Sequence, residues 1–378
     1  MDIICYSHLR WNFVYQRPQH LLSRLSRHFR VFFVEEPVYD AEKPYLDNSY
    51  SKEGVWIVIP HLPAGTHEID AIQIQENLLH DLFEYFKISR YIFWYYTPMA
   101  LSISHSFSPL LTVYDCMDEL SAFKNAPARL KELESVLLIK ADLVFTGGQS
   151  LYEAKKHQHP CIYPFPSSID KKHFGKSRNI SLEPAEQFLI PTPRIGFFGV
   201  IDERMDLELL EAISQERPKW HFIIIGPVVK IDPASLPTRS NIHYLGGKSY
   251  EELPTYLAGW DVAMMPFAIN ESTRFISPTK TPEYLAGGKP VVSTPIRDVV
   301  APYGENGLVY IAETHSAFID GIEQALNMEK KKEWLKTVDA FLENDSWDNT
   351  VDKMLYLINT KLESKQQNNL IQKENEYV

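Results

Sequence analysis

The stretch SPTKTPEYLAGGKPVVSTP, residues 277–295, places a lysine and a single carboxylate beside an expected helix start. Thr281, Pro282 and Glu283 have the residue types of an N-cap, a first-position proline and a first-turn acid. Backbone N–H groups at a helix start, together with the charge of Lys280, can bind a diphosphate. Glu283 can accept hydrogen bonds from two ribose hydroxyls. The same spacing fits an alternative equally well, in which Glu283 only complements the helix dipole and Lys280 is solvated.

Two further polar groups follow expected strands in the second half of the chain. Gly199 permits a tight turn directly after a strand, and Arg204 can then bind phosphate oxygens. The alternative is a surface loop in which Arg204 pairs with a neighbouring aspartate. The loop at 267–277 carries Glu271 and Arg274, which can contact a sugar or a phosphate but also suit an ordinary solvated loop.

In the first half, the segment WNFVYQRPQH lies between the first expected strand and the first expected helix. Trp11 offers a ring for stacking on a sugar, and Arg17 and His20 flank the helix start. Asp115 and Asp118 follow a buried strand, where acids serve as bases or hydroxyl anchors. The same two acids would also suit the cap of the next helix.

Short apolar runs that alternate with amphipathic helical patterns must position these residues. The expected strands, by residue number, are 2–6, 31–35, 55–59, 91–94, 111–114 and 143–146, then 194–198, 221–225, 241–245, 262–267, 291–293 and 308–311. Several are continuously apolar, which is typical of parallel strands covered on both faces. The alternation, found twice, predicts an α/β protein with two doubly wound sheets that bind ligands beyond the carboxyl ends of their strands.

The aperiodic segment 176–193 predicts a linker between two domains, which we place at 1–185 and 186–345. The segment 363–378 is polar and is expected to be a frayed or disordered tail. No G-x-G-x-x-G follows an expected strand, which disfavours a dinucleotide oxidoreductase, and no His, Cys or acid cluster has zinc spacing.

The 378 residues carry a net charge of −11, which argues against a broad nucleic-acid-binding surface. Three cysteines without metal or redox spacing suit a reduced cytosol. No apolar stretch is long enough to span a bilayer. The basic face of the first helix predicts either a solvated surface or attraction to an anionic lipid or phosphate-bearing acceptor; it comprises Arg24, Arg27, His28 and Arg30.

Taken together, these segments resemble the retaining GT-B-fold glycosyltransferases of family 4, the group 1 glycosyl transferases, most strongly over residues 194–312. The opening stretch has the family's donor signature, S-P-x-K-x-x-E-Y-x-A-x-G-K-P-V-V. ADLVFTGGQSLYEA and YPFPSSIDKKHF resemble family segments that precede the linker, and SWDNTVDKMLYLI resembles its terminal helix, expected here at 346–362 and crossing back onto the first domain. Through QRPQHL, the chain is similar to bacterial cell-envelope transferases of the teichuronic-acid type.

The resemblance implies two Rossmann-like domains facing a central cleft, the first on the acceptor side and the second binding the donor. It also shows three departures from the family pattern, of which one is WNFVYQRPQH in place of a glycine-rich acceptor-side loop. Phe275 stands eight positions before Glu283, where the family commonly has a second acid that contacts the donor sugar. Val200 stands after Gly199, where the family usually has an arginine.

We therefore expect a glycosyltransferase that moves a sugar from a nucleotide-diphosphate sugar to an envelope polysaccharide or lipid-linked acceptor, with retention. The alternatives are a nucleotide-sugar 2-epimerase-like isomerase and a catalytically inactive nucleotide-sugar-binding partner. No metal or other cofactor is expected, and the location expected is the cytoplasm, with peripheral contact at the inner face of the membrane. The residues expected to act are Asp115, Arg204 and Lys280 in catalysis, Gly199, Glu271, Arg274, Ser277, Thr279, Thr281 and Glu283 on the donor, and Trp11, Arg17, His20 and Asp118 on the acceptor side.

Overall fold

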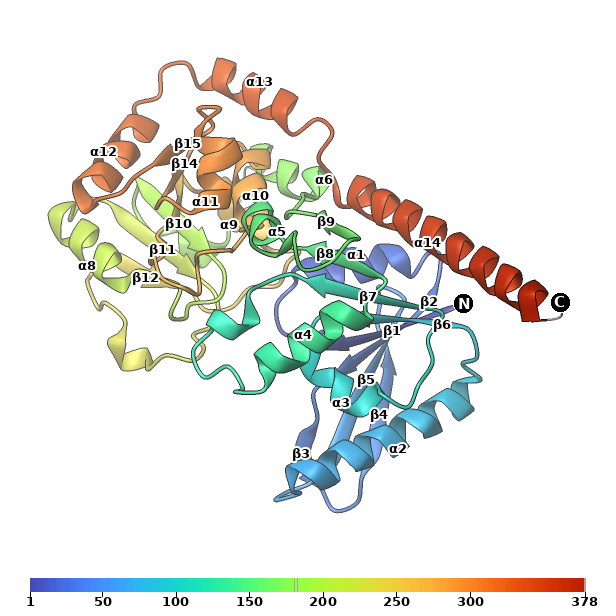
Figure 1. Cartoon of the computed structure of the whole chain (residues 1–378). Helices are drawn as coiled ribbons and strands as arrows, with labels where there is room; N and C mark the ends of the chain where they lie inside the picture. The colour runs from blue at the N-terminus through green and yellow to red at the C-terminus, as the bar shows by residue number, and fades with distance from the viewer. Residues whose placement is uncertain (180, 182, 377–378) are drawn as a thin grey trace.

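The computed structural model describes the backbone of residues 1–179, 181 and 183–376. Residues 180 and 182 of the expected linker, and 377–378 of the expected tail, lie outside this part. Two α/β lobes follow one another along the chain, the blue-to-green first domain and the yellow-to-orange second domain of Figure 1.

The first domain contains a nine-stranded sheet in the order β3-β5-β2-β1-β6-β7-β8-β9, with β4 paired to β5. The β4–β5 pair is antiparallel and the other pairs are parallel. The strands are β1 (Asp2–Ser7), β2 (Arg30–Glu35), β3 (Val38–Ala41), β4 (Tyr45–Tyr50), β5 (Val55–Pro63), β6 (Tyr91–Tyr95), β7 (Leu111–Cys116), β8 (Leu143–Thr146) and β9 (Ile162–Pro164).

The second domain contains a parallel six-stranded sheet in the order β12-β11-β10-β13-β14-β15. Its strands are β10 (Arg194–Phe198), β11 (His221–Ile225), β12 (Ile242–Tyr244), β13 (Val262–Met265), β14 (Val291–Ser293) and β15 (Val309–Ile311). The strands expected from apolar runs are confirmed, whereas β3, β4 and β9 were missed because they are short, partly exposed, or both.

Helices cover both faces of the first sheet. One apolar cluster joins this sheet to α1 and α14, and a second joins its other face to α2, α3 and α4. The helices of the chain are α1 (Arg17–Leu25), α2 (Glu68–Phe86), α3 (Leu101–Ser104), α4 (Leu130–Lys140), α5 (Gln149–Lys155), α6 (Lys171–Phe174), α7 (Ala185–Phe188), α8 (Leu207–Glu216), α9 (Leu253–Ala258), α10 (Lys280–Ala286), α11 (Arg297–Val299), α12 (His315–Leu326), α13 (Lys331–Phe341) and α14 (Trp347–Glu376).

The terminal helix α14 leaves the second domain and lies along the first (Figure 1). Its buried face comprises Trp347, Val351, Met354 and Ile358, which share a cluster with the apolar face of α1. The helix continues to Glu376, so residues 363–376 are helical, and the expectation of a frayed tail is wrong there.

Two local features around α1 and α10 add to the expectations. Arg24 and Arg27 both pair with Asp348 of α14, at 3.0 and 2.9 Å, while Arg27, His28 and Arg30 lie beyond the end of α1 and remain exposed. Helix α10 begins at Lys280 and has Thr279 as its N-cap, so Thr281 lies inside the first turn.

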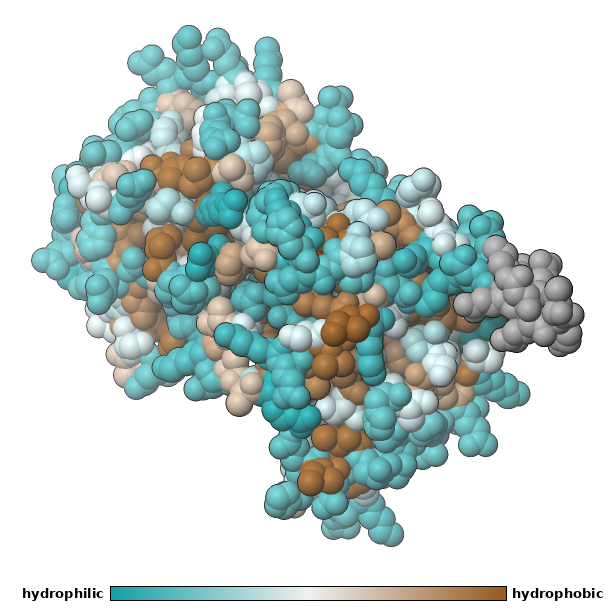
Figure 2. Space-filling view, viewed as in Figure 1, coloured by the Kyte–Doolittle hydropathy of each residue, from teal (hydrophilic) through white to brown (hydrophobic). Residues whose placement is uncertain are grey.

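The surface is mixed, as Figure 2 shows, with mostly hydrophilic residues and a few apolar patches. One patch lies over α4, where Val136 and Ile139 are exposed. Within the described residues, no helix is both long enough and apolar enough to cross a bilayer.

Candidate active site

A cavity of about 510 Å³, the main cavity below, lies between the two domains. Strand order in each sheet reverses beside a central strand, β1 in the first sheet and β10 in the second. Ligands of open parallel sheets bind at such positions, beyond the carboxyl ends of the strands. The cavity is lined by the loop after β1, by the residues that follow β10 and β11, and by the start of α10.

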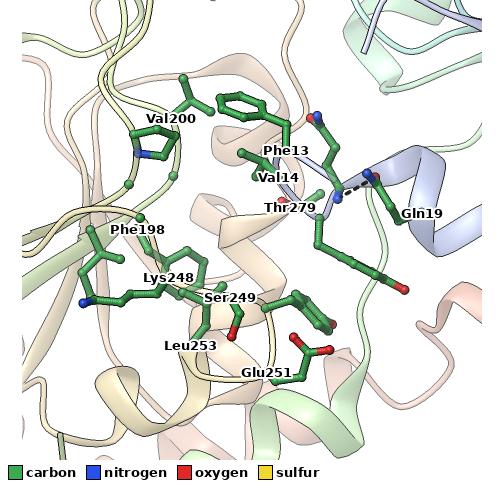
Figure 3. A pocket seen from close by; sticks show the side chains of 18 of the residues that line it. Phe13, Val14, Gln19, Phe198, Val200, Lys248, Ser249, Glu251, Leu253 and Thr279 are labelled. Atoms are coloured by element: carbon green, nitrogen blue, oxygen red, sulfur yellow. Dashed lines mark hydrogen bonds between the residues drawn. The ribbon is translucent and has the colours of Figure 1, made fainter. Parts of the chain in front are cut away.

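Figure 3 shows how the two domains contribute to this cavity. Phe13, Val14 and Gln19 come from the β1–α1 segment, and Phe198 and Lys248 come from the second domain on the opposite side. The N–H of Gln16 donates to the side-chain oxygen of Gln19, which closes the start of α1 and fixes the loop against the helix. Both domains therefore form the walls of the main cavity.

Lys280 supplies a cation in the wall of this cavity. Its ammonium lies over the rings of Phe197 and Phe267, at 5.6 and 5.8 Å from their centroids. Burial and the nearby guanidinium of Arg204 lower the pKa of Lys280 to about 8. Among the residues that the structure describes, no carboxylate forms an ion pair with Lys280, so the charge is available to an anion.

Glu283, one turn along α10, also lines the main cavity. It is only 6% exposed, and its carboxylate has no hydrogen-bond partner within the described part of the chain. Burial raises the pKa of Glu283 to about 7, against the opposing effect of the Lys280 charge. A buried carboxylate without a protein partner is suited to accept hydrogen bonds from ligand hydroxyls.

Arg204 follows β10 and is held in place by Asp202. Its Nε and Nη2 atoms donate to the Asp202 carboxylate, with distances of 2.6 to 3.1 Å. Arg204 thus pairs with a neighbouring aspartate, as the alternative expected from the sequence had it, and it also lines the cavity. Its Nη1 atom has no partner among the described residues and can donate to a phosphate oxygen.

A smaller cavity of about 100 Å³ adjoins the main one and shares Arg204 and Lys280 with it. Asp118 lines this second space, and no hydrogen bond or ion pair engages its carboxylate within the described residues. Burial raises the pKa of Asp118 to about 6, although Arg204 and Arg17 both oppose that rise. Asp118 is therefore an available acid beside two cations of the cleft.

Asp115 has a different environment. It is fully buried, and it accepts hydrogen bonds from Arg17 Nε and Nη2, at 2.8 to 3.2 Å. Arg17 also donates to the carbonyl oxygen of Phe165 at 2.6 Å. The pair supports the loop under the cleft, and Asp115 lines neither cavity.

The remaining expected residues fall into two groups. Those that line a cavity are Trp11, Arg17, Gly199, Ser277 and Thr279. Those that do not are His20, Glu271, Arg274 and Thr281. His20 is buried and stacks on Trp347 at 4.7 Å, and Thr281 directs its hydroxyl to the sulfur of Met265.

The loop at 267–277 brings no acid to either cavity. Glu271 and Arg274 are exposed and lie 3.7 Å apart as an ion pair. Phe275 packs against the apolar cluster on the α2–α4 face of the first domain, with Arg274 over its ring at 5.2 Å. Phe275 thus joins the two domains, and its side chain belongs to their interface.

Some cavity residues were missed by the sequence analysis. Gly226 follows β11 as Gly199 follows β10. Its position directly after a buried strand could have identified Gly226 as a cavity residue from the sequence. Lys52 and Glu53 lie in the turn between β4 and β5, and no signal found them because β4 was not expected. Lys52 pairs across the cleft with Glu251 at 2.5 Å.

Aromatic rings also join the domains beside the cavity. Tyr15 of the first domain stacks on Tyr250 of the second, with centroids 4.4 Å apart. Tyr250 stacks in turn on His173, at 4.1 Å. Tyr15 and Tyr250 line the same cavity as Glu283.

Comparison with known proteins finds similarity to sugar-transferring enzymes. Residues 192–328 match the family model described as Glycosyl transferases group 1. Over 222 residues, the chain is 23% identical to TuaH of Bacillus subtilis (strain 168), which is named as a teichuronic acid biosynthesis glycosyltransferase. That match covers 53% of this chain and 54% of TuaH, or about half the length of the relative.

Solved structures match nearly the whole chain at low identity. An E. coli trehalose-6-phosphate structure bound with UDP-2-fluoro glucose has a TM-score of 0.69 at 11% identity, covering 94% of this chain and 98% of that chain. The sucrose-phosphate synthase of Thermosynechococcus elongatus has a TM-score of 0.69 at 13% identity, covering 96% and 99%. Anabaena HepE in complex with UDP has a TM-score of 0.67 at 12% identity, covering 95% and 100%. These likenesses confirm the expected fold class, GT-B with two Rossmann-like sheets.

Proposed function

We propose that this chain, which carries a glycosyl transferases group 1 domain on a GT-B fold, transfers a sugar from a nucleotide-diphosphate sugar to a hydroxyl acceptor. One observation carries the proposal: Lys280 and Glu283, neither of them paired within the described residues, line one interdomain cavity. The cation of Lys280 suits a diphosphate, and the carboxylate of Glu283 can accept hydrogen bonds from the hydroxyls of the ribose next to it.

In this proposal the second domain binds the donor. Glu283 accepts hydrogen bonds from the ribose, and the backbone at Gly199 and Thr279 lies along the diphosphate. Lys280 and the Nη1 atom of Arg204 bind phosphate oxygens. The loops after β11 and β12 form the adjoining part of the cavity, where the base fits.

Sugar transfer leaves extra negative charge on the departing diphosphate. Lys280 and Arg204 are already in place and partly desolvated, so they stabilise that charge without a large rearrangement. These two cations can neutralise the diphosphate, so the proposal includes no metal ion. Retention at the anomeric carbon remains part of the proposal, and no step here requires a covalent intermediate on the protein.

We assign orientation of the acceptor hydroxyl to Asp118 in place of Asp115. Asp118 lines the smaller cavity next to both cations, whereas Asp115 is engaged by Arg17. With its pKa raised to about 6, Asp118 is mostly ionised near neutral pH. Its carboxylate can then accept a hydrogen bond from the acceptor hydroxyl.

The acceptor class proposed is an envelope glycan or a lipid-linked sugar, and it rests on the similarity to TuaH. Cytoplasmic location with peripheral membrane contact also remains a proposal. Arg24 and Arg27 pair with Asp348, but the Arg27 side chain stays 63% exposed, so this basic surface can still contact an anionic membrane in the proposal.

A thermal-shift screen over nucleoside diphosphates and their sugars tests the donor part of the proposal, since a bound ligand stabilises the fold. Turnover then separates the alternatives. Release of nucleoside diphosphate only with an acceptor present supports transfer, and isomerisation of the donor sugar supports an epimerase. Donor binding without any turnover supports an inactive partner, and no stabilisation by any nucleotide overturns the proposal.

A further inference from the structure

A separate cavity of about 300 Å³ lies in the first domain, outside the interdomain cleft. It is lined by the ends of β1, β2 and β6, by the first turns of α2 and by α3. Strand order reverses between β1 and β6, so the cavity occupies the ligand position of an open parallel sheet. None of the donor-binding residues assigned above lines it.

The charges around this cavity are negative. Glu35, Glu36 and Glu68 line it, and no lysine, arginine or histidine does so within the described part of the chain. Arg10 lies nearby but binds the Glu35 carboxylate at 2.9 Å and the Glu36 carbonyl oxygen at 2.6 Å. Glu68 likewise lies 3.6 Å from Arg129. A phosphate or carboxylate ligand would therefore find no cation on the cavity walls, whereas sugar hydroxyls would find acceptors.

The walls combine aromatic and apolar groups with unsatisfied polar ones. Tyr39 on β3 lines the cavity and is 47% exposed, so its side chain is accessible to a ligand. Tyr6 is 1% exposed, and its hydroxyl has no hydrogen-bond partner among the described residues. The Ser7 hydroxyl accepts the N–H of Leu9 at 3.0 Å and keeps its own hydrogen for donation. Such a mixture of apolar walls and a few polar groups is typical of small-ligand sites.

One wall of this cavity is shared with the interdomain cleft. The N–H of Trp11, which lines the cleft, donates to Glu35 at 2.8 Å. Glu35 lines the first-domain cavity. The linings of the two cavities are therefore linked by a hydrogen bond to the segment that follows β1.

We propose that the first-domain cavity binds an uncharged sugar ring of the acceptor, at a position remote from the hydroxyl that reacts. The proposal rests on the proposed glycosyltransferase function, and it narrows the acceptor to a chain that carries a neutral sugar away from its reacting end. Tyr39 stacks on the ring, while Glu36 and Ser7 hydrogen-bond to its hydroxyls.

The test uses saturation-transfer NMR on the full chain with glucose, N-acetylglucosamine, glucose 6-phosphate and glucuronate as probes. We expect signals from at least one neutral sugar that weaken about five-fold in Tyr39→Ala and in Glu36→Gln, the scale of a lost stacking contact or hydrogen bond. Tyr45→Ala is the matched control, because Tyr45 lies on the neighbouring strand β4, is 49% exposed and lines no part of the cavity. Its signals should equal those of the unmodified chain.

Two results would overturn the inference: neutral-sugar signals that are absent or do not depend on Tyr39, and Tyr39-dependent signals from the two anionic sugars as strong as the neutral ones. Nucleoside diphosphate binding, measured by thermal shift on the same samples, reports on the interdomain cleft alone. Its failure would count against the proposed donor site, and its success alongside absent sugar signals would count only against this cavity.

Discussion

Lys280 lies so close to Gly199 that a Cβ atom at position 199 would come within 2.2 Å of the lysine Cε. Gly199 has φ of +145°, and a Cβ at Gly226 would lie 1.8 Å from the Gly199 carbonyl oxygen. The ends of β10 and β11 therefore contact each other and Lys280 through backbone alone. This close approach brings the ammonium into the wall of the interdomain cavity.

We expect Gly199→Ala to abolish most nucleoside diphosphate binding, because the new methyl group displaces Lys280. Stability should fall by about 1–3 kcal/mol, the cost of a side chain in a sparsely populated backbone region. Gly307→Ala is the control, since Gly307 has φ of +66° and open space where its Cβ would lie. Chemical denaturation and calorimetry should show that both variants lose stability and that only the first loses binding.

Glu283→Ala should weaken nucleoside diphosphate binding by about 1–3 kcal/mol, the scale of a lost charged hydrogen bond. Glu271→Ala is a matched control, because Glu271 is an exposed acid on the same side of the second domain and lines no cavity. Calorimetry on both variants measures the difference. Equal affinities for the two would remove Glu283 from the donor site.

Donor affinity should depend on pH with a maximum between the pKa values of the two α10 groups. Glu283 accepts hydrogen bonds only when ionised, and burial raises its pKa to about 7, so affinity falls as the pH drops below that value. Lys280 attracts phosphate only when protonated, and burial lowers its pKa to about 8, so affinity also falls at higher pH. Titration calorimetry from about pH 6 to about pH 9 covers both groups.

Lys280→Arg provides the control for the alkaline side, because a guanidinium stays protonated throughout this range. We expect weaker binding in that variant but no decline above pH 8, the value to which the pKa of Lys280 is lowered. An alkaline decline that persists in Lys280→Arg would assign it to another group.

Asp118→Asn and Asp115→Asn should have opposite signatures. Asp118→Asn should keep the fold and donor binding while sugar transfer falls by about 100-fold, as for a lost proton acceptor. Asp115→Asn leaves the buried Arg17 charge without its partner, which should destabilise the chain by about 3–5 kcal/mol. Unfolding curves and transfer rates measured together distinguish the two roles, and full activity in Asp118→Asn would remove Asp118 from the reaction.

Phe275→Glu, which restores the acid common in the resembled family, should destabilise the chain and leave transfer no faster. Phe275 packs on the α2–α4 cluster of the first domain, so a carboxylate there is buried against apolar groups at a cost of about 1–3 kcal/mol. Ile269→Glu is the control, because Ile269 belongs to the same loop and is 64% exposed. A gain in transfer rate for Phe275→Glu would show that the loop can turn into the cavity.

Much of the donor side could be predicted from local patterns. Apolar runs located the strands of both sheets, and parallel strands present their following residues at one edge, which brought Gly199, Lys280 and Glu283 to one expected cleft. The acceptor side was less predictable because its residues find partners far along the chain. Arg17 pairs with Asp115 across 98 residues, and His20 stacks on Trp347 of the last helix.

The sequence by itself determined most strands of the two sheets, their alternation with helices and the positions of the glycines and charges that follow the strands. Those features depend on side-chain periodicity and backbone freedom within a few residues. Only the tertiary structure decided which charges remain available: Asp118, Lys280 and Glu283 are unpaired within the described residues, whereas Asp115, Arg24 and Arg27 are engaged. The physical reason is that an ion pair forms between whichever groups packing brings within contact distance, and packing is set by the whole chain.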